Sequence, residues 1–167
     1  IKMALALTGA GDITGGTFNR PVVRAHLNAH QGVGDNVTTV IQFNSVTVDT
    51  NSCYSTSTYK FTPNVSGYYF VHLKVHMGQD GGTSDVHHTL AEIVKNSSNI
   101  IAQSRQNPAN DAEDGGASHS CSTIIDMNGT NDYLEFRGKV DTGSTQTEIF
   151  YGNGSEVTQF LAFRLHA

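Results

Sequence analysis

Alternation of hydrophobic and polar residues, which is typical of β-strands, recurs along most of the chain, whereas helical periodicity is nearly absent. We expect strands, each bounded by clusters of Gly, Asn, Pro or Ser, at residues 21–28, 37–43, 57–61, 68–77, 88–95, 99–105, 118–127, 133–140 and 156–166. Many short strands separated by turn clusters indicate a sandwich or a barrel. Residues 96–98 and 128–129 are expected to close hairpins.

Two of these strands carry large apolar side chains on both faces. Residues 68–77 place Tyr69, Val71, Leu73 and Val75 on one face and Tyr68, Phe70 and His72 on the other, and residues 156–166 place Leu161 and Phe163 opposite Phe160 and Ala162. A sandwich on its own needs only one apolar face on each strand. We therefore predict that other subunits cover the second face, with Tyr68, Phe70, His72, Phe160 and Ala162 in the interface.

The composition of the chain argues against some classes of function. The 167 residues are enough for one domain with its own core. A net charge of −5, with only 10 scattered Lys and Arg residues, argues against a nucleic-acid groove. No apolar run is long enough to span a membrane. Residues 1–17 lack periodicity and are expected to be a linker or the end of a stem, with the domain over 18–167. Cys53 and Cys121 are either free thiols or one bridge.

The spacing of six residues resembles the central signature of the C1q/TNF-like family. The residues are Phe43, Asp49, Tyr54, Phe61, Gly67 and Tyr69. Val71 and Leu73 follow where that family has aromatics, and residues 159–165, which contain Phe163, resemble its last strand with Ala162 in place of a glycine. The resemblance implies an all-β, ten-strand jelly-roll sandwich that forms a homotrimer. It also implies that the first, middle and last strands line the threefold axis.

Residues 56–69 resemble the versions of this domain in bacteriophage structural proteins. We therefore expect a virion protein, with itself and other virion proteins as partners. It would be a trimeric knob that trimerises a fibre or spike, or decorates the capsid, and presents loops to a host glycan or receptor. The alternative is a secreted lectin-like or cytokine-like recognition protein of a cellular organism. The family is not enzymatic, and no nucleophile-elbow motif occurs, so a hydrolase is the least favoured interpretation.

Candidate ligand sites lie in the expected loops. Asp80, Asp85, Asp111 and Asp114 stand in Gly-rich segments that suit calcium, but EF-hand spacing is absent, so we expect no cofactor and leave calcium as the alternative. Tyr151 and Asn153, together with Tyr54, are candidate glycan contacts because aromatic faces and amide groups suit sugars, but packing within the loops is the favoured interpretation. His72, His76 and His119 are either polar fillers or meet their symmetry mates near the axis, where protonation would loosen the trimer.

Overall fold

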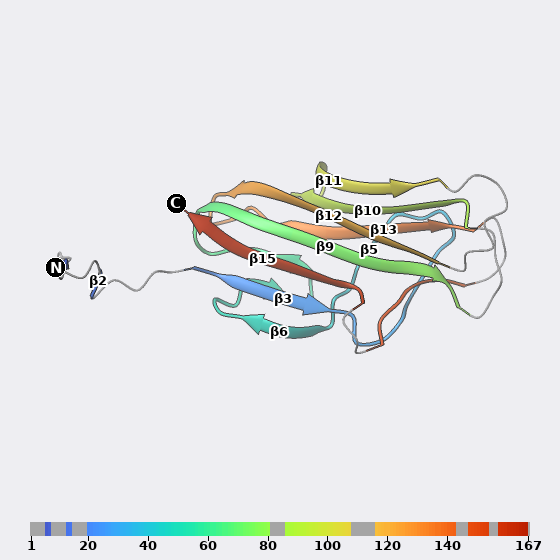
Figure 1. Cartoon of the computed structure of the whole chain (residues 1–167), viewed down its shortest axis with the longest axis horizontal. Coiled ribbons are helices and arrows are strands. Elements are labelled where there is room, and N and C mark those ends of the chain that lie inside the picture. The colour runs from blue at the N-terminus through green and yellow to red at the C-terminus, as the bar shows by residue number, and fades with distance from the viewer. Residues whose placement is uncertain are drawn as a thin grey trace.

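The computed structural model describes residues 6–7, 13–14, 20–80, 86–107, 116–142, 147–153 and 157–166, and these residues contain strands and no helix. Two antiparallel sheets lie face to face, as expected for a jelly-roll sandwich (Figure 1). A separate short pair, β1 (Ala6–Leu7) and β2 (Ile13–Thr14), precedes them. The remaining residues of the expected linker over 1–17 lie outside the described residues.

The first sheet is built around one long central strand, β9 (Gly67–Gln79). Strand β12 (Gly116–Met127) pairs along nearly its whole length on one side. On the other side, β15 (Gln159–His166) pairs with the first half of β9 and β14 (Glu148–Phe150) with its end. The sheet continues through β4 (Gln31–Val33) beside β14, and through β3 (Val22–His26) and β6 (Ser45–Asp49) beside β15.

The second sheet has the order β11-β10-β13-β8-β7, with β5 also pairing with β13. Its strands are β5 (Thr39–Val40), β7 (Tyr54–Ser55), β8 (Lys60–Phe61), β10 (His88–Lys95), β11 (Asn99–Gln106) and β13 (Leu134–Asp141). Strands β10 and β11 form the hairpin expected around residues 96–98, where Asn96 and Ser97 adopt positive φ angles.

The core lies between the two sheets and is rich in aromatic rings. Phe160 of β15 is at its centre: its ring stacks on Phe136 at 4.2 Å between centroids and also contacts Phe43, Tyr54 and Phe61. All but Tyr54 are completely buried, and Tyr54 is nearly so. Each such side chain contributes about 1.5–3 kcal/mol through burial, so this cluster is the main source of stability within one protomer.

The two ends of the sandwich differ in what they carry. The described part of the sandwich begins at Arg20, beside the start of β3, at the same end as the last strand finishes (Figure 1). At the opposite end β9 finishes, β10 begins, β11 finishes and β12 begins. We call the first the termini end and the second the loop end. No helix suited to crossing a membrane occurs in the described part of the chain.

Candidate functional site

The outward face of the first sheet carries a row of apolar side chains at its termini end. Ile124 on β12 stands opposite Phe70 on β9, and Phe70 stands opposite Phe163 on β15, with 5.3 Å between the two ring centroids. Val22 on β3 pairs with Phe163 and completes this apolar row. Ile124 is 59% exposed, and neighbouring Tyr68 is 54% exposed. One protomer therefore leaves large apolar groups in solvent along several adjoining strands.

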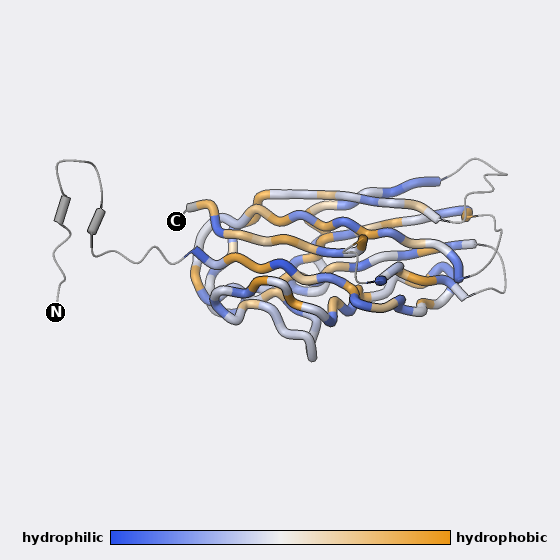
Figure 2. Tube along the Cα trace, turned by 60° about the horizontal axis from the view of Figure 1, so that its bottom comes forward, coloured by the Kyte–Doolittle hydropathy of each residue, from blue (hydrophilic) through white to orange (hydrophobic). Residues whose placement is uncertain are grey.

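The outward face of the second sheet has the opposite character. Along β13 the residues that alternate with the apolar or small residues facing the core are Glu135, Arg137, Lys139 and Asp141. Arg137 pairs with Glu135 at 2.7 Å, and the Lys139 ammonium donates to the Asn36 side-chain oxygen at 2.8 Å. These outward side chains are charged and bond to nearby polar groups, but they are not fully solvated: Glu135 is 8% exposed, and the neighbouring strand β10 is buried along most of its length. Figure 2 shows the hydrophobic and hydrophilic positions along the strands of both sheets. Among the described strands, the apolar row that crosses four strands lies on the first sheet, whereas the second sheet has the shorter outward pair of Val94 and Ile100.

The prediction that Phe160 and Ala162 lie in a subunit interface is wrong. Both are fully buried in the protomer core. The register of β15 explains why: Phe160 pairs with the buried Leu73 and Ala162 with the buried Val71, so their side chains point between the sheets. The outward side chains of β15 are those one residue away. Tyr68, Phe70 and His72 do lie on the outward face.

Most of the signature residues lie inside the sandwich. Phe43, Phe61, Tyr69, Val71 and Leu73 are fully buried, and Tyr54 is nearly so. Asp49 accepts hydrogen bonds from the backbone N–H groups of Cys53 and Tyr54 at 2.8 and 2.9 Å, and the Tyr54 hydroxyl donates to the Phe43 carbonyl at 3.0 Å. Gly67 has a φ of 136°, which residues with a Cβ rarely adopt. These contacts hold the fold together.

Phe163 departs from this pattern. It was expected in the core with the signature, but it is only half-buried and belongs to the apolar row on the outward face. Its partner in the register is Phe70, which lies on the same outward face.

The three candidate histidines occupy two different places. His72 and His76 point outward from β9, where the His76 Nδ1 lies 2.9 Å from the Ser118 hydroxyl. His119 lies between the sheets, with its ring nitrogens 2.7 Å from the Thr89 hydroxyl and 2.9 Å from the Ser104 hydroxyl. Burial lowers its pKa, and so does neighbouring His88. His119 therefore cannot meet symmetry mates across the outward face.

The comparison with family models decides the assignment. The model of the C1q domain matches residues 24–154, which is most of the chain. This chain belongs to the C1q domain family. A search of curated proteins found no match. The C1q domain and its TNF-like relatives are in general recognition modules without enzymatic activity.

Solved structures agree with this fold. The globular domain of zebrafish complement 1qA superposes with a TM-score of 0.61 at 12% identity, covering 87% of this chain and 98% of its own. Murine APRIL at pH 5.0 has a TM-score of 0.61 at 9% identity, covering 88% and 100%. The Eiger TNF of S. frugiperda has a TM-score of 0.58 at 11% identity, covering 89% and 93%. At these identities the likeness concerns the jelly-roll fold alone.

The aromatic candidates for glycan contact in this C1q domain are already engaged. Tyr54 was expected to be exposed on a loop, but it is 8% exposed and belongs to the core. The Tyr151 hydroxyl donates to the Gln79 carbonyl at 2.6 Å, and its ring packs between His76 and His30. Asn153 is exposed beside it. Tyr151 therefore supports the loop end of the domain and does not present a free aromatic face.

Of the four carboxylates considered for calcium, only Asp80 lies within the described residues, where it is exposed at the end of β9. Asp85, Asp111 and Asp114 lie outside them. Within the described ranges, no group of three or more potential metal ligands comes together. Calcium binding therefore stays a prediction.

The two cysteines are both free. Burial raises the pKa of the Cys53 thiol, and it raises the pKa of Cys121 to about 11. A thiol with a raised pKa is a poor nucleophile, so neither is suited to catalysis.

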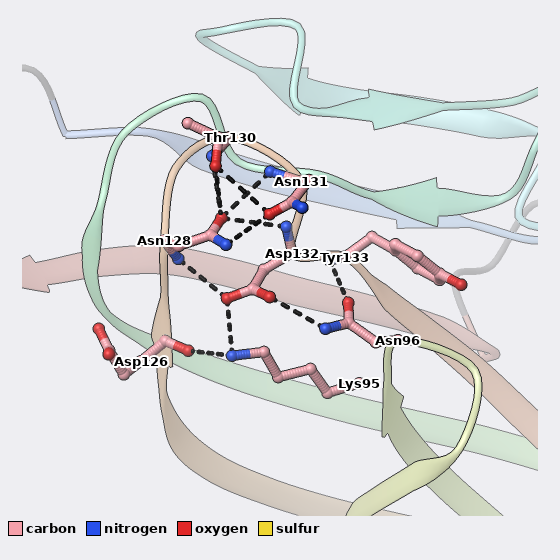
Figure 3. Close-up of polar contacts among 8 residues, drawn as sticks. All are labelled: Lys95, Asn96, Asp126, Asn128, Thr130, Asn131, Asp132 and Tyr133. Carbon is pink, nitrogen blue, oxygen red and sulfur yellow. Dashed lines mark hydrogen bonds and ion pairs between the residues drawn. The ribbon is translucent and has the colours of Figure 1, made fainter.

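At the termini end, the turn between β12 and β13 is closed by its own polar contacts (Figure 3). The Asn128 side-chain oxygen accepts from the backbone N–H groups of Thr130, Asn131 and Asp132, all within 3.1 Å. The Asp132 carboxylate pairs with Lys95 at 2.7 Å, and hydrogen bonding from Lys95 lowers its pKa. These groups satisfy one another, so this turn fixes the end of the sandwich and offers no open ligand site.

Proposed function

We propose that this C1q domain is a non-enzymatic trimeric knob of a phage virion protein, which joins three chains and presents its loop end to a host surface. The observation that carries the proposal is the apolar row across β12, β9, β15 and β3, because the described residues form no further layer over it. Exposed apolar surface that extends over adjoining strands marks an interaction site. Fully burying one such side chain contributes about 1.5–3 kcal/mol.

A ring of copies covers this face better than a flat pair would. In a cyclic assembly, the same patch on each copy packs against a different patch on the next, and the ring closes without leaving unpaired surfaces. Ile100 on the edge strand β11 is 50% exposed and lies in the sheet opposite the apolar row. It offers a second apolar position at the edge of the sandwich for such a contact.

The two ends of the sandwich suit attachment to a stem and contact with a host surface. The chain enters at the termini end, where the apolar row also lies, so a preceding stem would hold the trimer at that end. The loop end of the described sandwich then faces away from the stem. The resemblance of residues 56–69 to phage structural proteins supports the virion setting.

The oligomeric state is the first test. Light scattering and native mass spectrometry of the purified domain should give the mass of three chains. Tyr68→Asp places a charge beside the apolar row and should give a folded monomer by circular dichroism. Val37→Asp is the matched control, because Val37 is 53% exposed in the segment before β5, away from the row. A monomeric wild type, or a trimeric Tyr68→Asp variant, would refute the assembly.

The surface-binding role has its own test. The labelled trimer should bind bacterial cell-envelope polysaccharide more tightly than the Tyr68→Asp monomer, because three linked sites gain avidity. Equal binding by both forms would refute trimeric presentation. The proposal that the domain belongs to a virion protein is tested by determining the DNA sequence on both sides of the coding region. Stem segments and virion genes are expected there, whereas a signal peptide or collagen stalk would instead support the secreted recognition protein.

A further inference from the structure

Between the apolar row and the end of β9, the outward face is mostly polar, and we call this part of it the polar half. The formal charges at the levels of His72, Lys74 and His76 are positive, whereas Leu161 lies opposite His72 and the exposed Asp80 lies beyond His76, at the end of β9. On β9 the outward residues after Phe70 are His72, Lys74 and His76. The register places Ser122, Ser120 and Ser118 of β12 opposite them, in that order. Each basic or imidazole side chain thus has a hydroxyl group beside it, and the ring of His76 is already bonded to Ser118 at 2.9 Å.

Strands β15 and β3, on the other side of β9, add further polar and basic side chains to this part of the face. Gln159 of β15 is opposite Lys74, and its side-chain oxygen accepts a hydrogen bond from Arg24 of β3 at 2.9 Å. His26 of β3 is opposite Gln159, and Ser45 of β6 is opposite His26. No carboxylate stands at these levels of the described strands, although the whole chain has a net charge of −5.

Lys74 is the centre of this polar half. Its side chain is exposed, and among the described residues no carboxylate pairs with it. Burial lowers the pKa of the neighbouring His76, and the positive charge of Lys74 lowers it further. A surface that carries Lys and Arg side chains with no carboxylate beside them attracts anions.

We propose that this polar half, centred on Lys74, binds a small oxyanion such as sulfate or phosphate between the subunits of the trimer. The inference rests on the proposed function, because three copies of Lys74 approach one another only if the outward face of β9 lines the threefold axis of the trimer, as the family resemblance implies. Like charges in a partly dehydrated interface repel strongly. An oxyanion offsets that repulsion, with Lys as the point charge and Ser hydroxyls and imidazoles as further donors. The ligand is a free ion and not a charged polymer, because a closed interface between subunits would exclude a polymer.

The test measures the trimer dissociation constant by dilution in analytical ultracentrifugation. Sodium sulfate at about 10 mM is compared with sodium chloride at equal ionic strength; sub-denaturing urea is added to all samples where the trimer is too tight. For an anion with a Kd of about 1 mM, sulfate should lower the dissociation constant about tenfold. Lys74→Gln should lose this difference and Lys74→Arg should keep it. Lys139→Gln, with the same charge change on the other sheet, should also keep it.

Two results from the dissociation constants would overturn the site while leaving the trimer intact. One is an equal sulfate effect in wild type and Lys74→Gln, because sulfate also stabilises compact states through its general exclusion from protein surfaces. The other is a wild-type trimer that does not respond to sulfate. Binding of sulfated dextran as strong as that of free sulfate would also overturn it, since that shows an open surface. A chain that is monomeric in every buffer refutes the proposed function itself, and the measured mass alone shows this.

Discussion

Replacing Ile124 by Ser separates assembly from folding more cleanly than any other change on the outward face. Ile124 is 59% exposed in the protomer, so Ser removes little that holds the single chain together. Surface substitutions of this kind usually change the free energy of unfolding by less than about 0.5 kcal/mol. In the proposed trimer the same side chain is covered by a neighbouring copy, so its removal should weaken the association of the subunits.

The magnitude follows from the exposed fraction. Fully burying an isoleucine contributes about 2.5 kcal/mol, so the 59% still exposed leaves about 1.5 kcal/mol for each subunit to gain on assembly. Three subunits give about 4.5 kcal/mol if all three side chains are completely covered. At about 1.4 kcal/mol per factor of ten, Ile124→Ser should raise the trimer dissociation constant about a thousandfold.

The assay combines two measurements on the same samples. Sedimentation equilibrium gives the dissociation constant, and urea denaturation of the dissociated protein gives the stability of the protomer. Val37→Ser is the control, since it removes a similarly exposed side chain away from the apolar row. A change of less than about threefold in the dissociation constant for Ile124→Ser, or an equal change for Val37→Ser, would show that the apolar row is not the interface.

Three further predictions concern the protomer. His119 has a lowered pKa, so below its ordinary value of 6.5 the unfolded chain takes up the proton more readily. Stability should therefore fall by up to about 1.4 kcal/mol per pH unit below that value, and urea midpoints of His119→Gln should be less sensitive between pH 7.5 and 5.5. Phe160→Ala should cost about 3–5 kcal/mol, whereas Phe163→Ala should cost the monomer clearly less; equal losses in urea denaturation would contradict their placement. Gly129→Ala should cost more than about 1 kcal/mol in thermal unfolding, because its φ is 71° and an added Cβ would lie 2.3 Å from the Ser66 nitrogen.

Long alternating segments made the fold predictable, and short ones did not. The segments 68–77, 88–95, 99–105 and 118–127 correspond to β9, β10, β11 and β12 within one or two residues at each end. In contrast, 37–43 contains only β5, because Ile41 and Phe43 are buried in a connection that pairs little with neighbouring strands. The three-residue strands β4 and β14 have too few residues to show a period.

The candidate interface could be predicted only in part, because alternation shows two faces without saying which is inner. In 156–166 the sequence offers Phe160 on one face and Phe163 on the other, and both are large and aromatic. The choice is made by pairing with β9, which puts Phe160 opposite Leu73 and Phe163 opposite Phe70. That pairing joins residues far apart in the chain, so no local pattern contains it. The inward orientation of His119 could not be predicted for the same reason, since it depends on the pairing of His119 with Val75.

The position of β3 determines how a pull on the chain would be transmitted through the domain. The strand starts at the termini end, runs along the long axis of the sandwich, and is bonded on both sides, to β15 and to β6 (Figure 1). Tension applied through a preceding stem would therefore act along the strand and load all of these hydrogen bonds in shear at once. Under such a pull the domain would resist unfolding through the combined strength of this ladder, and the bonds would not break one after another.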